Sequence, residues 1–390
     1  MTPSTQNGRK IPILYILLVF PMVQLRELRE LYLKAAYAFS DCSSLSLVNL
    51  NKVESIGMMT FSRCKALTSI SLPDTLISMG KATFSYCSKL AYISLPENRA
   101  LKVEYDIVDG TAYANNSENY ENGVLYIGKY LIKTSSDFST VETYTVKAGT
   151  KVIANRAFLS YTSKLATLNL PDGVIRIGER SFADSTNLSN ISIPSSVLYV
   201  GSEAFENTAY LNNYIKNKTN SESDGTLYAG PVLLSAYWFT GTEFSVKAGT
   251  VTIADGALFE KSKAATVTSI ILPDSLKAIG NNAFKETAIT SISLPEGLIR
   301  IGEYAFDDCK SLSSVSPTPN LEELGQYAFS NCQLTTFVLP SSVWYIGVMP
   351  FAKNPIETLY CEAESKPSGW QNSWNQTFNA TFNTVWGYKG

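Results

Sequence analysis

The chain has 390 residues, of which 45% are hydrophobic and 17% are charged, a composition typical of a folded protein and not of a disordered one. Lys and Arg number 32 against 34 Asp and Glu, with no clustered basic stripe, which argues against nucleic acid as a partner. The chain contains no histidine, which excludes catalysis that depends on an imidazole near neutral pH.

Residues 1–30 precede the first regular repeat and carry an apolar run, Ile11 to Val23, behind Arg9 and Lys10. The run is shorter than a membrane span of about 20 residues, and it resembles the apolar region of a secretory signal. Two prolines interrupt it, however, and no small-residue cleavage site follows. Two interpretations therefore stay open: a cleaved signal peptide, or an irregular first rung or amino-terminal cap.

Residues 31–355 repeat a pattern in steps of 22 to 24 residues, in which a Gly is followed four residues later by a Phe. The pairs are Gly57/Phe61, Gly80/Phe84, Gly178/Phe182, Gly201/Phe205, Gly280/Phe284, Gly302/Phe306, Gly325/Phe329 and Gly347/Phe351. The exceptions are Ala154 with Phe158, Ala254 with Leu258 or Phe259, and an eroded first copy at Phe39. These make roughly eleven rungs. A fixed period in the twenties is typical of a leucine-rich repeat, in which each coil holds a short strand and a return segment.

The unit Leu67 to Cys87 shows how this pattern predicts structure. Ile70 and Leu72 alternate with serines, so one face of a short strand is apolar and must point inward. The proline that follows cannot donate to a strand ladder and ends the strand. We expect Gly80 to form a tight or positive-φ corner and Phe84 to fill the core. One coil cannot bury these groups alone, but stacked coils can.

Two segments, near residues 97–147 and 209–247, break the period and resemble each other. Gly123 to Gly128 matches Gly225 to Gly230, and the run Val-Lys-Ala-Gly-Thr follows in both. Alternating apolar residues around Gly-containing turns predict a β-hairpin in each segment, which projects from the solenoid or replaces a rung. The hairpins either pack as plain structure or help to bind a partner, since loops inserted on a regular scaffold often carry specificity.

Residues 356–390 leave the period and are rich in large aromatics, among them Trp370 and Trp374. The last rung of a solenoid exposes an open apolar core that needs a cap, and large aromatic rings suit that position. The sequence therefore predicts an aromatic carboxy-terminal cap. A glycan platform, in which exposed tryptophans stack on sugar rings, is the alternative.

Five of the six cysteines occupy one column, three residues after the motif Phe, at Cys42, Cys64, Cys87, Cys309 and Cys332. Other rungs place Ser185, Thr208, Thr287 or Asn354 in that column. Interchange with small polar residues indicates a position that requires small size and a weak hydrogen bond, so we expect free thiols. No Cys-x-x-Cys pair is present, which argues against zinc. We expect no metal, no cofactor and no catalytic residue.

The pattern Leu-x-x-Ile-x-Leu-Pro, Ile-Gly-x-x-Ala-Phe and x-x-Cys resembles the BspA-type leucine-rich repeat, a family that includes treponemal and Bacteroides surface proteins. The resemblance covers nearly the whole chain, from about Leu31 to Pro355. It implies a non-enzymatic protein, secreted or at the cell surface, that adheres to host or neighbouring-cell proteins. It transfers no binding residue, because the matching positions are core and corner positions. The fold we expect is an α/β-class leucine-rich-repeat solenoid, β-dominated and right-handed.

The positions between the inward strand residues should form a concave face that is neutral and rich in hydroxyl groups. We predict that binding uses Ser69, Ser71, Tyr92, Ser94, Thr167, Asn169, Asn190, Ser192, Ser291 and Ser293. The partner expected there and at the hairpins is an extracellular or host-surface protein. A glycan held by exposed aromatics is the alternative. We expect a monomer without a membrane span.

Overall fold

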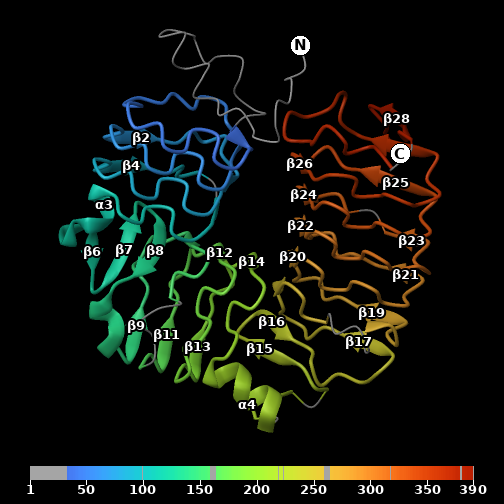
Figure 1. Cartoon of the computed structure of the whole chain (residues 1–390). Coiled ribbons are helices and arrows are strands. Elements are labelled where there is room, and N and C mark those ends of the chain that lie inside the picture. The colour runs from blue at the N-terminus through green and yellow to red at the C-terminus, as the bar shows by residue number, and fades with distance from the viewer. Residues whose placement is uncertain are drawn as a thin grey trace, which may run out of the picture. The chain divides into compact units, whose positions relative to one another are not determined.

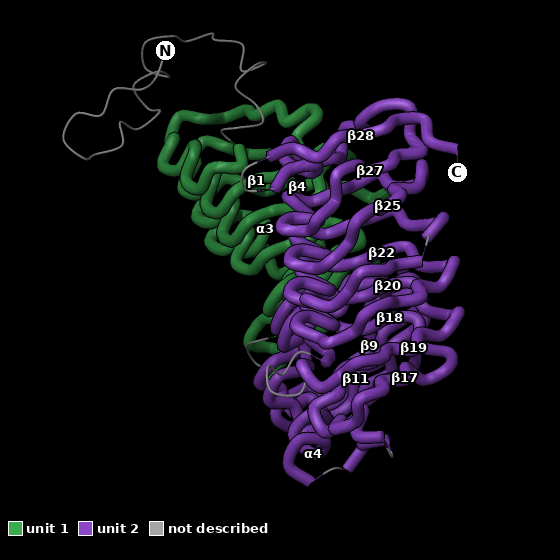
Figure 2. The backbone as a smooth tube through the Cα atoms, turned by 90° about the vertical axis from the view of Figure 1, so that its right-hand side faces the viewer, with its two compact units in different colours: residues 1–139, 150–161 green, residues 140–149, 162–390 purple. Residues whose placement is uncertain are grey.

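A computed structural model of the chain describes residues 33–98, 100–158, 164–217, 219–222, 224–258, 264–316, 318–377 and 380–389 (Figure 1). The predicted amino-terminal segment, residues 1–30, lies outside the described residues, as do Leu31 and Phe259. The chain divides into two compact units, drawn in different colours in Figure 2. Unit 1 is Met1–Ser139 with Thr150–Tyr161, and unit 2 is Thr140–Gly149 with Thr162–Gly390.

Unit 1 is a stack of short parallel strands that includes one hairpin. Its strands are β1 (Ser55–Ile56), β2 (Ser69–Ser71), β3 (Ser78–Met79), β4 (Tyr92–Ser94), β5 (Lys102–Val103), β6 (Tyr120–Glu121), β7 (Val124–Ile127), β8 (Tyr130–Thr134) and β10 (Val152–Ile153). Its described helical segments are α3 (Ala112–Asn115), η1 (Ser117–Asn119) and η2 (Ser136–Thr140), the last of which ends at the boundary of the unit. β1, β3 and β5 pair in parallel, and β2 pairs with β4. β7 and β8 form an antiparallel hairpin, and β8 then pairs in parallel with β10.

Unit 2 repeats this arrangement over more rungs. Its strands are β9 (Thr143–Thr145), β11 (Thr167–Asn169), β12 (Arg176–Ile177), β13 (Asn190–Ser192), β14 (Tyr199–Val200), β15 (Leu227–Ala229), β16 (Val232–Ser235), β17 (Glu243–Ser245), β18 (Thr252–Ile253), β19 (Ser269–Ile271), β20 (Ala278–Ile279), β21 (Ser291–Ile292), β22 (Arg300–Ile301), β23 (Ser314–Val315), β24 (Glu323–Leu324), β25 (Thr336–Leu339), β26 (Tyr345–Ile346), β27 (Thr358–Cys361) and β28 (Asn383–Trp386). The helix α4 (Ala209–Asn217) precedes the hairpin β15–β16. One seven-stranded sheet has the order β15-β16-β18-β20-β22-β24-β26. On the other side of the rungs lie the sheets β9-β11-β13, β17-β19, β21-β23 and β25-β27-β28 (Figure 1).

The described chain makes about 14 turns, more than the eleven predicted, because rungs are hidden in the two irregular segments. β5 stacks on β3 as an ordinary rung, with Ile107 fully buried in place of the motif Phe. The hairpin strands β8 and β16 each take the place of a rung, since each pairs in parallel with the next rung. The hairpins therefore replace rungs, and the fold is a β-dominated solenoid whose described helices are few and short.

The core of each rung is built around the motif Phe. Phe61, Phe84, Phe306 and Phe329 are at most 1% exposed, and the rings of Phe306 and Phe329 stack with their centroids 5.1 Å apart. Full burial of such a ring contributes roughly 1.5–3 kcal/mol. The eroded first copy, Phe39, stacks on Phe61 in the same way. In the rung of Ala254 the aromatic position is filled by Leu258, which is 3% exposed.

The motif glycines are required by close approach, which confirms the tight corner expected at Gly80 and not the alternative of a positive φ. A Cβ atom on Gly80 would lie 2.5 Å from the backbone N of Met58 and 2.6 Å from the backbone C of Gly57. The positive φ occurs two residues later, at 54° in both Met59 and Ala82. Alanine is accepted at positions 154 and 254, where the preceding rung is a hairpin strand that stays extended and does not turn.

The cysteine column confirms the expected free thiols and weak hydrogen bonds. All six cysteines are free, and the thiols of four of them donate to the carbonyl oxygen of the motif Phe one rung earlier. These contacts are Cys64 to Phe39 (3.2 Å), Cys87 to Phe61 (3.0 Å), Cys309 to Phe284 (3.3 Å) and Cys332 to Phe306 (3.2 Å). Asn354 donates to Phe329 in the same manner at 2.6 Å. The column therefore ties each rung to the one before it.

We expect a thiol reagent to label the native protein at pH 8 only at Cys42, the one cysteine that is not buried. Burial raises the pKa of Cys309 to about 11 and that of Cys361 to about 12, so the reactive thiolate is scarce there as well as shielded. Mass spectrometry after labelling should show one modification on the folded chain and six in denaturant. A Cys42→Ser variant should show none when folded, and fast labelling of the other five would contradict the burial.

Candidate interaction surface

Unit 1 places four of the predicted binding residues on two adjacent parallel strands. β2 and β4 pair so that Ser69 lies beside Tyr92 and Ser71 beside Ser94. Ser69, Ser71 and Tyr92 are exposed, Tyr92 at 59%, and Ser94 is half-buried. The buried residue between each pair, Ile70 or Ile93, holds the strand on the core. The four side chains therefore form two short rows on one face.

Unit 2 extends the same kind of rows over three strands. β11 and β13 pair Thr167 with Asn190 and Asn169 with Ser192. β9 adds Thr143 and Thr145 to the two rows. The sequence analysis missed these two threonines because β9 lies within a segment that interrupts the motif. Its alternation of Thr, Tyr and Thr was the signal that could have identified the strand.

The rows on β9, β11 and β13 form a face without charge. All six side chains are Thr, Asn or Ser, and the described contact within it is a 3.3 Å hydrogen bond from Asn169 Nδ2 to Thr145 Oγ1. The remaining predicted residues, Ser291 and Ser293, are exposed but lie apart, where β21 pairs Ser291 with Ser314 of β23. The predicted site is thus three separate patches, two of them on unit 2.

The predicted residues do not lie on the concave side of unit 2. There the inner side of the bend carries β12, β14, β20, β22, β24 and β26, and β21 and β23 lie on the opposite side (Figure 1). Contacts cross the bend: the Tyr199 hydroxyl donates to Glu323 Oε1 at 2.7 Å. The bend arises where the hairpin β15–β16 replaces a rung. After the hairpin, the chain comes back against the rung of β14, and Asp255, which follows β18, donates from its backbone N to Val200 O at 2.9 Å. This shortens the side of the rungs that holds β14 and β18.

The two hairpins share one internal framework. Thr111 caps α3 and Thr208 caps α4, the helices that precede the two hairpins. Their hydroxyl oxygens accept hydrogen bonds from Ala114 N at 3.1 Å and from Leu211 N at 3.2 Å. Tyr113 and Tyr210 then donate from their hydroxyls to the carbonyls of Tyr126 and Tyr228, both at 2.6 Å. The sequence analysis missed these helices, although the capping threonines are a recognisable start signal.

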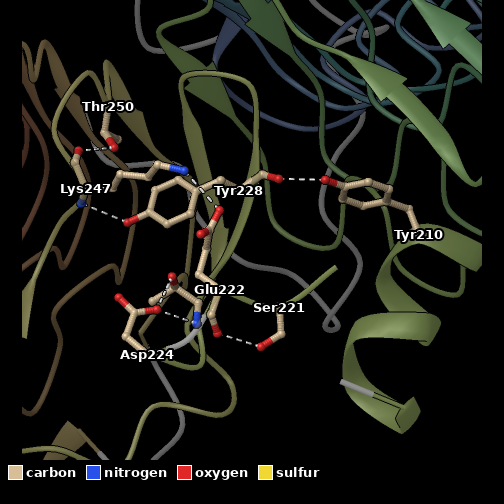
Figure 3. A network of polar contacts seen from close by, with 8 residues as sticks. Tyr210, Ser221, Glu222, Asp224, Tyr228, Lys247 and Thr250 are labelled. Carbon is tan, nitrogen blue, oxygen red and sulfur yellow. Dashed lines mark hydrogen bonds and ion pairs between the residues drawn. The ribbon is translucent and has the colours of Figure 1, made fainter. Parts of the chain in front are cut away.

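The exposed side of the second hairpin carries a small polar network (Figure 3). Lys247 Nζ lies 3.0 Å from Glu222 Oε1, and its backbone N donates to the Tyr228 hydroxyl at 3.0 Å. Asp224 accepts from the backbone and the hydroxyl of Thr226 at 3.1 and 2.6 Å. Lys247 and Glu222 are half-exposed, at 57% and 44%, so this is a solvated surface that fixes the base of the hairpin.

Trp370 and Trp374 of the carboxy-terminal segment are buried in unit 2 and are not available to stack on sugars. Trp370 is 2% exposed and Trp374 is 3% exposed, with ring centroids 4.6 Å apart. Trp370 Nε1 donates to Val343 O at 3.0 Å, and Gln371 N donates to Ile346 O at 2.9 Å. The segment thus continues the stack beyond β26 and covers its apolar core.

Among the described residues, no three His, Cys, Asp or Glu side chains come together as metal ligands. Within the same part of the chain, no helix has both the length and the apolar character needed to cross a membrane.

Six copies of the BspA type leucine rich repeat region match this chain, over residues 35–117, 114–229 and 236–357. A comparison with curated proteins finds no match. Among solved structures, a leucine-rich repeat protein from Bacteroides ovatus is 19% identical with a TM-score of 0.34, over 86% of this chain and 59% of that one. This chain thus spans less than two thirds of that protein.

A leucine-rich cell surface protein from Faecalibacterium prausnitzii is 16% identical with a TM-score of 0.25, over 86% of this chain and 84% of that one. The pneumococcal vaccine antigen PcpA is 16% identical with a TM-score of 0.23, over 87% and 72%. These likenesses are weak, and the assignment rests on the repeat matches, which cover most of the sequence. The chain belongs to the BspA-type leucine-rich repeat family.

Proposed function

We propose that this protein is a secreted or cell-surface scaffold that binds host or neighbouring-cell proteins through its exposed strand faces and its two hairpins. The observation that carries the proposal is the uncharged face on β9, β11 and β13, where rows of Thr, Asn and Ser lie exposed or half-exposed in parallel register. Membership in a repeat family that generally serves as a non-catalytic scaffold supports it.

The chemistry of this face favours a partner that forms directional hydrogen bonds. Hydroxyl and amide groups donate and accept without charge, so binding should depend little on salt, unlike association steered by charged patches. A stable protein interface buries about 800 Å² on each partner, more than six small side chains provide. The hairpin β15–β16 of the same unit would have to supply the remaining contact area.

We expect Asn190→Arg with Ser192→Arg to weaken binding to a partner protein about tenfold or more, which corresponds to about 1.4 kcal/mol. Two guanidinium groups would stand where the neutral rows meet the partner. Binding can be measured by surface plasmon resonance against a panel of extracellular-matrix and host-surface proteins, at two salt concentrations.

The matched control is Thr186→Arg with Gln333→Arg, which adds the same charge at exposed positions of unit 2 outside its strands. It should bind like the unmodified protein. If the unmodified protein binds no member of the panel better than the Asn190/Ser192 variant does, adhesion through this face is wrong. Selective binding on a glycan array, with no protein bound, would favour the glycan alternative.

A further inference from the structure

Six polar side chains meet on the inner side of the bend in unit 2, and we call them the inner-bend cluster. They are Arg176, Tyr199, Asp255, Asn281, Arg300 and Glu323, which come from rungs spread over 148 positions of the sequence, 176 to 323. In a straight stack, with strands about 4.8 Å apart, β24 would lie about 14 Å from β18, and β14 would lie still further from β24. Direct contact between β14 and β24 therefore marks a tight bend.

Tyr199 is the centre of the inner-bend cluster. The guanidinium carbon of Arg176 lies 3.7 Å from the centroid of its ring, and that of Arg300 lies 4.5 Å from it. The Tyr199 hydroxyl donates to Glu323 Oε1 at 2.7 Å. Burial, with a further effect from Glu323, raises the pKa of Tyr199, so the hydroxyl keeps its proton and remains a donor.

The rest of the cluster holds Arg300 in place. Arg300 donates to Asn281 Oδ1 at 3.0 Å and lies 3.7 Å from Glu323 Oε2. Asn281 in turn donates from its backbone and side-chain nitrogens to Asp255, at 2.6 and 2.8 Å. The Arg300 and Glu323 side chains are only 11% and 22% exposed. The cluster thus holds two positive and two negative side chains, of which Arg300 and Glu323 form an ion pair that is largely removed from bulk water.

Such a cluster holds a bend without making it permanent. The cost of removing charges from water offsets most of the attraction between them, so a buried ionic cluster contributes little net stability compared with an apolar core. When the bend opens, water can solvate the same groups. A bend that was closed by packed leucine and phenylalanine side chains would have no comparable alternative.

The corresponding bend in unit 1 is crossed by different side chains, since the guanidinium carbon of Arg156 lies 4.1 Å and Lys81 Nζ lies 4.4 Å from the centroid of the Tyr105 ring. Its backbone contact is the same, since Asn155 N donates to Val103 O at 2.9 Å, as Asp255 does to Val200. The positions equivalent to Arg176 and Tyr199 are Ser78 and Lys102, which pair across β3 and β5. Lys102 lies 3.6 Å from Glu104 of its own rung. The backbone bend is therefore common to both units, and the contacts of Tyr199 and Arg300 with Glu323 belong to unit 2.

We propose that the inner-bend cluster is a latch that sets the angle of the bend in unit 2, and that releasing it lets the two arms of the unit move apart. The faces on β9, β11 and β13 and on β21 and β23 lie on different arms. Their separation, and hence the span of surface offered to a large partner, would then depend on whether the latch is closed.

The test is the distance between spin labels at Ser192→Cys and Ser314→Cys, measured by pulsed electron paramagnetic resonance in a Cys42→Ser background. Both sites are exposed, and the remaining native cysteines are buried. The parent should give one narrow distance distribution. Tyr199→Ala should broaden it and shift it to longer distance, and Tyr199→Phe, which loses only the hydrogen bond to Glu323, should broaden it less.

Tyr304→Ala is the matched control, because its ring stacks on Tyr327 of the adjacent rung and not across the bend. It should leave the distribution as in the parent. A Tyr199→Ala variant that is folded by circular dichroism and keeps the narrow distribution overturns the latch. If Tyr199→Ala does not fold, Tyr199→Phe is the deciding variant. An unchanged distance distribution in Tyr199→Phe then overturns the latch. The measurement needs no partner, so it is independent of the proposed adhesion.

Discussion

Replacing Gly80 by alanine should lower the free energy of unfolding by about 3 kcal/mol, at the upper end of the range for overpacked sites. The three atoms nearest to the added Cβ, at 2.5 to 2.9 Å, all belong to the backbone of the preceding rung. Backbone atoms inside a hydrogen-bonded stack cannot rotate away as a flexible side chain can. Urea denaturation followed by circular dichroism measures the loss.

The reverse substitution, Ala154→Gly in the same unit, is the control. It removes one buried methyl group and adds backbone freedom, so it should cost about 1 kcal/mol. If Gly80→Ala costs no more than Ala154→Gly, the rungs are not as tightly stacked at the corner as the contact distances require.

Replacing Trp370 by alanine should cost about 3 to 5 kcal/mol, the range for removing a large aromatic ring from a core. The ring is 2% exposed, contacts Trp374 and Trp386, and donates to the carbonyl of Val343. Its removal leaves a cavity and an unpaired buried acceptor. Thermal unfolding should show the loss as a clearly lowered midpoint.

Tyr237→Ala is the control for this prediction, since Tyr237 belongs to the same unit but is 36% exposed. Its cost should stay within about 0.5 kcal/mol. A glycan array separates capping from sugar binding: Trp370→Ala should change no glycan signal beyond what unfolding explains. Unchanged stability together with selective loss of a glycan would instead make the tail a sugar-binding platform.

The parts of the fold that could be predicted are those whose side chains repeat. The period, the inward Ile and Leu, the core Phe and the cysteine column all follow from packing one rung on the next, and each rung restates the pattern. The rungs of β5, β8 and β16 were missed because their stacking depends on backbone pairing, which Ile107 or a hairpin can satisfy without the motif.

The candidate site was harder to predict than the fold. Alternation identified which strand residues face solvent, as with Asn190 and Ser192, because period two is a local property. The alternation could not show which side of the coil is concave, because that depends on where the chain of β18 comes back against the rung of β14. Tyr199 and Glu323 are 124 positions apart, and nothing in the sequence near either of them indicates that they meet.

The matching bends suggest how proteins of this design grow in length. The backbone contact between Val103 and Asn155 reappears between Val200 and Asp255, with a capped helix and a hairpin between the partners in both cases. The stretch from one such bend to the next is therefore a cassette of nearly a hundred residues. A gene that gains or loses one cassette keeps the rungs in register at both joins, so chain length can change in large steps without an unpaired strand.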